Sequence, residues 1–377
     1  MLISVTDPIW QTYLFAAVFF LILIISIKPR KIGEWVSLNL STELKGLAII
    51  MVVLSHIGYF LVSDTRFLWP LSIAAGIGVD LFLLLSGFGL AASQLKNYLK
   101  PLDFYKKRLI KLFVPLWLVL VVFFGLNFIS IKTDYSWMYV IQSFLGIFPK
   151  ANLYWDINSP LWYLTFLLGY YLIFPLVYSK KAPWAPALIL AFIPYLLIYF
   201  WKPEFFNNIL HMYKIHYLAF PLGVLLAWLV TKLPSAEILE KWSKGWKAIS
   251  YYLVLIIALA IFIYSNINSG IDGTPLKHQL MSLVGVFSIL IVFILKKIEF
   301  KALYWVGVFS YEIYLWHWPI MYHYDFLYRF MPSGIATILY LIFFVGLGWV
   351  VNKVTDLILN KKRALVCPVP DNRLTKK

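Results

Sequence analysis

The sequence predicts an all-α protein, a polytopic bundle of about eleven transmembrane helices. Hydrophobic residues make up 62% of its 377 residues and charged residues only 13%, and apolar runs of span length recur along the chain. About 20 apolar residues in a helix cross the hydrocarbon core of a bilayer. Soluble domains are far less apolar, so the composition excludes a soluble fold.

The apolar segments define the expected spans one by one. The first has no basic residue before it and is followed by Lys28, Arg30 and Lys31, so we expect it to be retained as a span and not cleaved as a signal peptide. The eleven expected spans are 9–27, 45–62, 71–93, 112–131, 161–178, 184–201, 209–230, 249–266, 278–295, 303–322 and 334–351.

The distribution of basic residues predicts the sidedness. The net charge is +16, and 26 of the 33 Lys and Arg fall in segments that face the cytoplasm if the N-terminus is outside. Because cytoplasmic loops collect Lys and Arg, the charge indicates a cell-membrane protein with a cytoplasmic C-terminus, and not a nucleic-acid partner. An even number of spans would place basic loops on both sides. The segments predicted to be cytoplasmic are 28–45, 94–111, 179–183, 231–248, 296–302 and 352–377.

Two ionisable residues, His56 and Asp80, lie deep inside consecutive spans. His56 is eleven residues, close to three helical turns, after Lys45, so both project from one helix face with His56 about 16 Å above Lys45. Asp80 lies roughly 15 Å below the outer end of the next span, at a similar predicted height. A carboxylate beside an imidazole fixes its tautomer and raises its basicity. The spacing predicts His56 as a general base oriented by Asp80, or else a pair that only stabilises helix packing.

A basic cluster follows where the chain re-enters the membrane. Lys107, Arg108 and Lys111 stand at the start of the 112–131 span. Basic side chains there either hold phosphates or anchor the chain at the cytoplasmic surface. On residue type alone, both interpretations stay open.

The remaining polar residues within spans are few. Glu312 and His317 either add polar groups to the same cavity or make hydrogen bonds between helices. His211, His216 and Lys214 lie near an outer helix end, where they either meet an acceptor or, as we expect, are solvated interface residues. The six histidines are too scattered to indicate a metal site. The single cysteine, Cys367, excludes an intramolecular disulfide and a Cys-based metal cluster.

Taken in order, these blocks resemble the acyltransferase 3 family of integral-membrane O-acyltransferases. Lys45-x10-His56 is similar to the family's Arg-x10-His signature, with Lys in place of Arg. The other blocks that carry the resemblance are Gly78-Val-Asp80-Leu-Phe with Ser86-Gly87-Phe88, the basic re-entry Phe104 to Pro115, Leu161-Trp162-Tyr163-Leu164 with Pro175, Tyr217 to Gly223, and Ser310 to Pro319. The acidic pair that many bacterial members carry after the Trp block is absent here, where the run is Thr165-Phe-Leu-Leu-Gly169.

The resemblance implies transfer of an acyl group, commonly acetyl, from cytoplasmic acyl-coenzyme A to a hydroxyl of a cell-surface carbohydrate or its lipid-linked precursor. It gives His56 the catalytic position, and no metal is implied. With the family core over 38–351, residues 1–37 hold an additional span. The sequence shows no second domain, so we expect one membrane-embedded domain over 1–377, and its composition predicts a basic, poorly ordered cytoplasmic tail over 352–377. The residues expected to face the coenzyme's phosphates are Lys45, Lys107, Arg108 and Lys111, and those expected to line the substrate cavity are Ser86, Trp162, Glu312 and His317.

Two other functions fit the same polar residues. A glycan transporter or flippase also places ionisable groups at mid-membrane, although the absence of an internal repeat argues against it. A non-catalytic membrane protein that only scaffolds envelope enzymes is the other alternative, and in such a protein His56 could be replaced without loss of function. Consumption of a thioester by the purified protein separates the enzyme from both.

Overall fold

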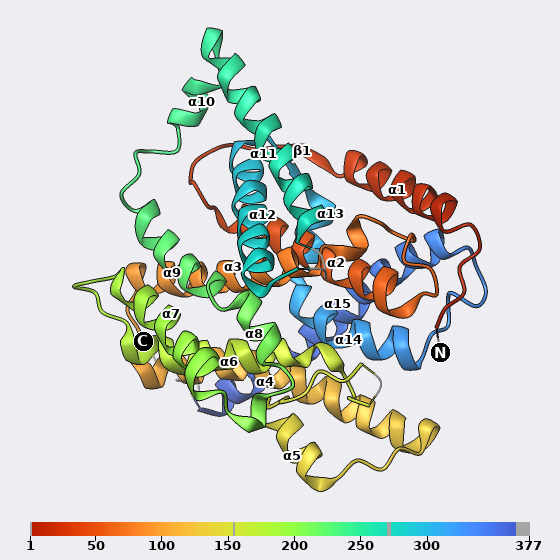
Figure 1. The fold of residues 1–377 in the computed structure, drawn as a ribbon. Helices are drawn as coiled ribbons and strands as arrows, with labels where there is room; N and C mark the ends of the chain where they lie inside the picture. The colour runs from red at the N-terminus through yellow and green to blue at the C-terminus, as the bar shows by residue number, and fades with distance from the viewer. Residues whose placement is uncertain (1, 154, 270–272, 367–377) are drawn as a thin grey trace, which may run out of the picture.

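The computed structural model describes residues 2–153, 155–269 and 273–366, and this part of the chain is almost wholly helical (Figure 1). The helices are α1 (Pro8–Ile25), α2 (Leu38–Ser55), α3 (Ala75–Lys96), α4 (Pro101–Leu126), α5 (Trp137–Phe144), α6 (Trp162–Val177), α7 (Ala185–Leu196), α8 (Leu210–His216), α9 (Ala219–Val230), α10 (Ile238–Trp242), α11 (Ala248–Asn268), α12 (Pro275–Leu295), α13 (Lys301–Val308), α14 (Ser310–His323) and α15 (Ser333–Val366). Short 3-10 turns cover Leu71–Ile73, Ser159–Leu161, Glu204–Phe206 and Gly245–Lys247, and π-helical turns cover His56–Leu61, Asn127–Ile131 and Leu197–Trp201. Two three-residue strands, β1 (Ile27–Pro29) and β2 (Ile298–Phe300), pair antiparallel.

Nine helices within the described residues are long and apolar enough to cross a membrane. Two of the eleven expected spans differ. The helix over Ala185–Trp201 is shorter than these nine, and the expected span 303–322 is broken at Phe309, whose backbone leaves the helical region between α13 and α14. The all-α polytopic bundle is thus confirmed, while the count of eleven and the sidedness stay predictions.

The expected tail also differs. The last helix runs to Val366, well beyond the predicted end at residue 351. Between these positions the sequence has no Gly or Pro, and the next Pro is Pro368, so nothing breaks the helix. Residues 352–366 are therefore helical, and residues 367–377 of the expected tail lie outside the described residues.

Interactions between loops join segments that the charge pattern assigns to one side. On the predicted cytoplasmic side, β1 pairs with β2, Lys28 forms a 2.7 Å ion pair with Glu299, and the Trp35 Nε1–H donates to the Pro234 carbonyl. On the other side, the Gly334 N–H donates to the Gln11 side chain. The contacts agree with the predicted alternation of the helices.

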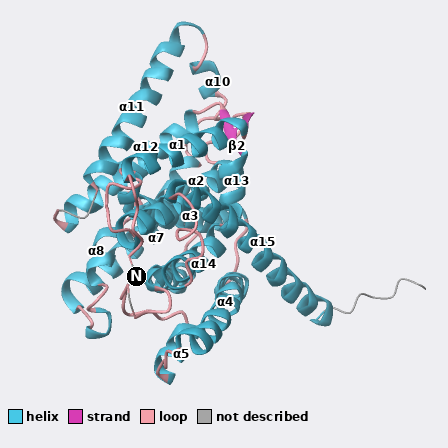
Figure 2. Ribbon diagram, turned by 90° about the vertical axis from the view of Figure 1, so that its right-hand side faces the viewer, coloured by secondary structure: helices cyan, strands magenta, loops and turns pink. Residues whose placement is uncertain are grey.

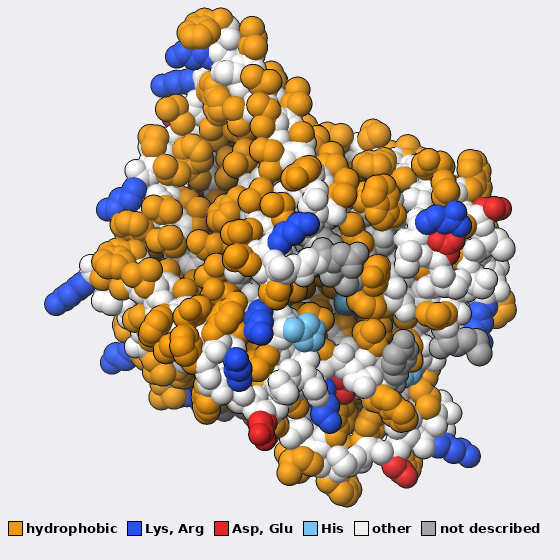
Figure 3. All heavy atoms as spheres, in the orientation of Figure 1, with side chains coloured by type: hydrophobic (Ala, Val, Ile, Leu, Met, Phe, Trp, Pro, Cys, Tyr) orange, Lys and Arg blue, Asp and Glu red, His pale blue; other side chains and the backbone are white. Residues whose placement is uncertain are grey.

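Helices α10 and α11 project from the bundle in both ribbon views (Figures 1 and 2). The apolar side chains of α11 are mostly exposed, as are those of α1. Hydrophobic side chains likewise cover much of the surface in Figure 3. In a soluble protein such patches are rare, and in a bilayer they are the surface that faces lipid.

Two glycine pairs bring the central helices into close contact. At the crossing of α2 and α13, a Cβ on Gly46 would lie 2.0 Å from the Leu303 carbonyl oxygen, and one on Gly307 would lie 1.8 Å from that of Thr42. The crossing of α3 and α9 uses Gly87 and Gly223 in the same way. Small residues at helix crossings let membrane helices approach closely, and these crossings fix α2 and α3, which carry the site.

Gly307→Ala is expected to destabilise the protein, because the added methyl meets a backbone oxygen that cannot rotate away. Overpacking typically costs about 1–3 kcal/mol. The measurement is thermal unfolding in detergent, with Gly346→Ala as the matched control, since a Cβ there meets nothing within 4 Å. Equal melting temperatures for the two variants would contradict the close crossing.

Candidate active site

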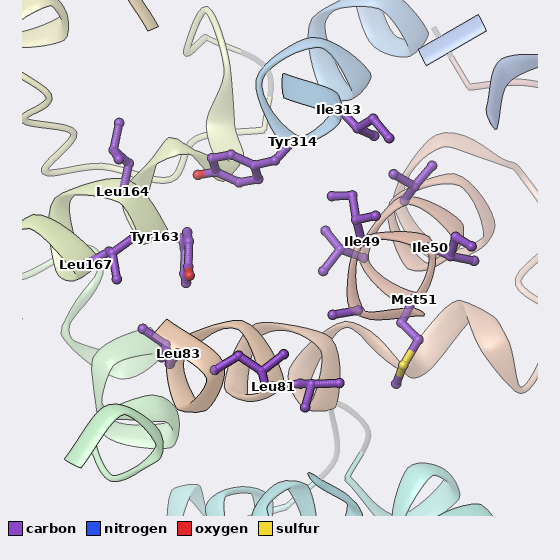
Figure 4. Packing of buried hydrophobic residues seen from close by; sticks show 14 of the residues in the cluster. Ile49, Ile50, Met51, Leu81, Leu83, Tyr163, Leu164, Leu167, Ile313 and Tyr314 are labelled. Carbon is purple, nitrogen blue, oxygen red and sulfur yellow. The ribbon is translucent and has the colours of Figure 1, made fainter. Parts of the chain in front are cut away.

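One cavity of about 660 Å³ is lined by Lys45, His56 and Ser86, three of the residues that the sequence predicts for the site. Its lining begins near Lys45 on α2, passes His56, and reaches His211 and His278 near the opposite helix ends. Figure 4 shows Tyr163 and Tyr314 facing the space beside α2 and α3. The cavity is therefore a path along most of the length of α2, with a mostly apolar wall and polar groups at intervals.

His56 lies on this cavity, at the point where α2 passes into its terminal π-helical turn. Such turns are frequent at functional sites. Its partner is not a carboxylate: His56 Nδ1 lies 2.8 Å from His317 Nε2, and the two rings are nearly parallel. His317 therefore contacts the His56 ring and does not itself line the cavity, contrary to the expectation that it would.

The hydrogen bonds of His317 determine which His56 nitrogen is free. His317 is fully buried, and its Nδ1 lies 2.8 Å from the Tyr314 carbonyl oxygen. A carbonyl only accepts, so His317 Nδ1 carries the proton and His317 Nε2 accepts from the His56 Nδ1–H. His56 Nε2 then keeps its lone pair. The half-buried His56 ring thus has the tautomer that a proton acceptor needs.

Asp80 is not the partner of His56, which corrects the expectation from the sequence. The fully buried Asp80 carboxylate accepts from His216 Nδ1 at 2.7 Å and from the Ser282 hydroxyl at 2.5 Å. Asp80 therefore orients a different histidine, on α8.

The register of α2 and α3 explains the misplacement. A Cβ on Gly78 would meet Ala48 and Val52, so this part of α3 lies beside α2 one turn or more below His56. Asp80 follows two residues further toward the Lys45 end. Counting residues from the span ends did not anticipate this offset, because the chain enters α3 through a loop and a 3-10 turn, Leu71–Ile73.

His216 is the functional candidate that the sequence interpretation missed. It is buried, 4% exposed, and lines the cavity beside the Trp162 ring, whose centroid is 5.7 Å away. The prediction of a solvated interface residue is wrong, because α8 is short and its last turn lies within the bundle. A histidine five residues before Pro-Leu-Gly in an apolar run was the available signal.

The basic residues divide into two groups. Lys45 lines the cavity, and Arg108 is near enough to Lys45 for the two charges to interact. Arg108 Nε is buried and has no hydrogen-bond partner among the described residues. In contrast, Lys107 and Lys111 are exposed and do not line the cavity. The structure thus brings two of the four predicted donor-binding residues together.

The other predicted cavity residues also divide. Ser86 and Trp162 line the cavity, and Ser86 interacts with the Tyr163 and Tyr171 side chains. Glu312 does not line it: this buried side chain interacts with Asn352 of α15. A helix-packing role for Glu312 was one of the two interpretations that the sequence left open, and its position favours that one.

The segment before α6 covers part of the cavity. The Asn158 side chain donates to the Leu315 carbonyl at 2.8 Å, and Ser159 lines the cavity. Burial raises the pKa of the nearby Asp156 carboxyl.

Trp137 and Trp155 are largely exposed, as expected for aromatic rings at a membrane surface. In Figure 3, histidine and lysine side chains lie around a hollow near the centre of the face shown.

Among the described residues, no three His, Cys, Asp or Glu side chains are grouped so that they could hold a metal ion. A search of curated proteins and a search of solved structures found no match. The model of one family, described as an acyltransferase domain (Acyl_transf_3), matches residues 43–353, which is most of the chain. The matched range includes the His56–His317 pair, the His216–Asp80 pair and Lys45. The chain therefore belongs to the acyltransferase 3 family and is a membrane acyltransferase that takes an acyl donor as co-substrate.

Proposed function

We propose that this protein moves an acyl group, most simply acetyl, from cytoplasmic acyl-coenzyme A to a hydroxyl of a cell-surface carbohydrate or its lipid-linked precursor. One observation carries the proposal: His56 presents a free Nε2 lone pair to a cavity that also reaches Lys45. The family membership supports acyl transfer, and the excess of basic residues in alternate loops supports a cytoplasmic donor.

The chemistry needs one base and no covalent step. His56 Nε2 takes the proton of the acceptor hydroxyl, and the oxygen attacks the thioester carbonyl carbon. The tetrahedral intermediate then expels the coenzyme thiolate, which takes the proton from His56. His317 holds the tautomer throughout, because its Nε2 accepts from His56 Nδ1–H. The positive charge that His56 gains during the reaction strengthens that hydrogen bond.

The donor would bind with its phosphates at Lys45 and Arg108. The unpaired Nε–H of Arg108 is a donor without an acceptor, and a phosphate oxygen would satisfy it. Along α2, Lys45 is about 16 Å from His56, so the long pantetheine arm of acyl-coenzyme A would span the interval. The proposal therefore places the N-terminus outside and the C-terminus in the cytoplasm.

Arg108→Glu is expected to raise the KM for acetyl-coenzyme A tenfold or more with little change in kcat. The reason is that charge-assisted hydrogen bonds contribute about 1.5–3 kcal/mol, and each 1.4 kcal/mol is about tenfold in affinity. Lys106→Glu is the matched control, since it makes a like charge reversal two residues away on an exposed position of α4. Equal KM values for the two variants would contradict the phosphate contact.

The test of the function is release of free thiol from acetyl-coenzyme A by the purified protein in detergent, with a mixture of glycans as acceptors. The proposal predicts thiol release that depends on glycan. A glycan transporter, which the same cavity would also suit, releases none. A scaffold for other envelope enzymes would likewise show no turnover alone.

A further inference from the structure

A second histidine faces the same cavity with a different partner. His216 Nδ1 is 2.7 Å from Asp80 Oδ1, and the other carboxylate oxygen accepts from Ser282. The remaining ring nitrogen, His216 Nε2, has no partner among the described residues and opens onto the cavity. The proposed base His56 opens onto the cavity in the same way, so each of these two rings has a free nitrogen there.

The two imidazoles have different hydrogen-bond partners. Asp80 is fully buried, and within the described residues its one ion-pairing partner is His216. An uncompensated charge is very costly in a membrane interior. The pair without net charge holds two protons, one in the hydrogen bond between Asp80 and His216 Nδ1 and the other on His216 Nε2. His56, in contrast, is held by a chain that ends on the Tyr314 carbonyl. Environments that separate two titratable groups in this way assign one as base and the other as proton-bearing donor.

The depth of the pair suits the donor substrate. Gly78 lies beside Ala48 and Val52, which places Asp80 on the Lys45 side of His56. An acyl-coenzyme A that enters from the Lys45 end therefore reaches the level of His216 with its thioester, while the acceptor hydroxyl lies at His56.

We propose that His216 is a second catalytic residue, whose Nε2–H donates a hydrogen bond to the thioester carbonyl oxygen as negative charge develops on it. This inference rests on the proposed function. The proton balance of the reaction is unchanged: the acceptor proton moves to His56 and then to the thiolate, the C–S bond breaks as the C–O bond forms, and His216 keeps its own proton. Asp80 is then a positioning residue that orients the His216 ring and keeps its Nε2 protonated.

Kinetics of the purified full chain test the assignment. A preorganised donor to a developing oxyanion is typically worth about 10²–10³ in kcat. His216→Ala is expected to lower kcat by about that factor with the KM for acetyl-coenzyme A within threefold of wild type. His216→Gln, which keeps an N–H donor, should recover part of the loss, and Asp80→Asn should fall between the two. Lys214→Gln, on the same helix but outside the cavity lining, is the control expected to match wild type.

A binding measurement separates catalysis from folding. The probe is the unreactive ketone analogue of acetyl-coenzyme A, in which CH₂ replaces sulfur, and its affinity for His216→Ala should stay near that of wild type. A kcat for His216→Ala within threefold of wild type overturns the proposal, and so does a variant that loses kcat and analogue binding together without rescue by His216→Gln. If wild type itself releases no thiol, the proposed function fails first and this inference with it.

Discussion

Replacing His56 by alanine is expected to lower acyl transfer by about 10³-fold or more, the largest effect of any single substitution in the cavity. A positioned general base typically contributes about 10²–10⁴-fold, and His56 is the proposed base. The KM for acetyl-coenzyme A should change little, because Lys45 and Arg108 lie about three turns away along the cavity. The measurement is thiol release under saturating donor and acceptor.

His323→Ala is the matched control for this substitution. It removes the same ring from the end of α14, at a position outside the cavity lining, and should keep the wild-type rate. Residual activity above about a tenth of wild type in His56→Ala, with both proteins folded, would contradict the base role.

His317→Phe is expected to lower kcat by about 10²-fold, although this ring touches no substrate. Phenylalanine cannot accept from His56 Nδ1–H, so His56 is free to turn or to exchange its tautomer, and the lone pair at Nε2 is no longer fixed. Loss of the group that sets the tautomer of a catalytic histidine is known to be severe in Ser-His-Asp enzymes. Steady-state kinetics with both substrates measure the effect.

A merely structural role for His317 predicts a different pattern. In that case His317→Phe would lower the melting temperature and the amount of active protein while leaving kcat per active site intact. His317→Gln provides the second comparison, because its amide can both accept from His56 and donate to the Tyr314 carbonyl. Recovery of kcat by Gln over Phe supports orientation, and equal values would contradict it.

Sequence reasoning found the fold class because bilayer thickness sets the length of an apolar helix. It found Lys45 and His56 on one helix face because helical periodicity is local, and both residues line the cavity. The break at Phe309 was not visible, because the apolar run continues through it. Its cause lies in how α13 packs against α2 and α14 against α15.

The partners of the polar residues could not be derived from spacing. Pairing of Asp80 with His216, and of His56 with His317, depends on the register between helices that are distant in sequence. A shift of one turn exchanges one partner for another, and apolar sequences do not encode that shift in any readable pattern. The same limit applies to Lys107 and Arg108, which are neighbours in sequence but differ in whether they reach the cavity.

In the proposed reaction, acyl groups pass directly from coenzyme A to a hydroxyl acceptor that His56 deprotonates. The most direct test incubates the purified wild type and His56→Ala with acetyl-labelled acetyl-coenzyme A and mixed cell-surface glycans, and then measures label on the glycan. We predict ester-linked label with wild type and about a thousandth of that rate with His56→Ala. Equal labelling by both proteins, or glycan that gains no label with wild type, would contradict acyl transfer with His56 as the base.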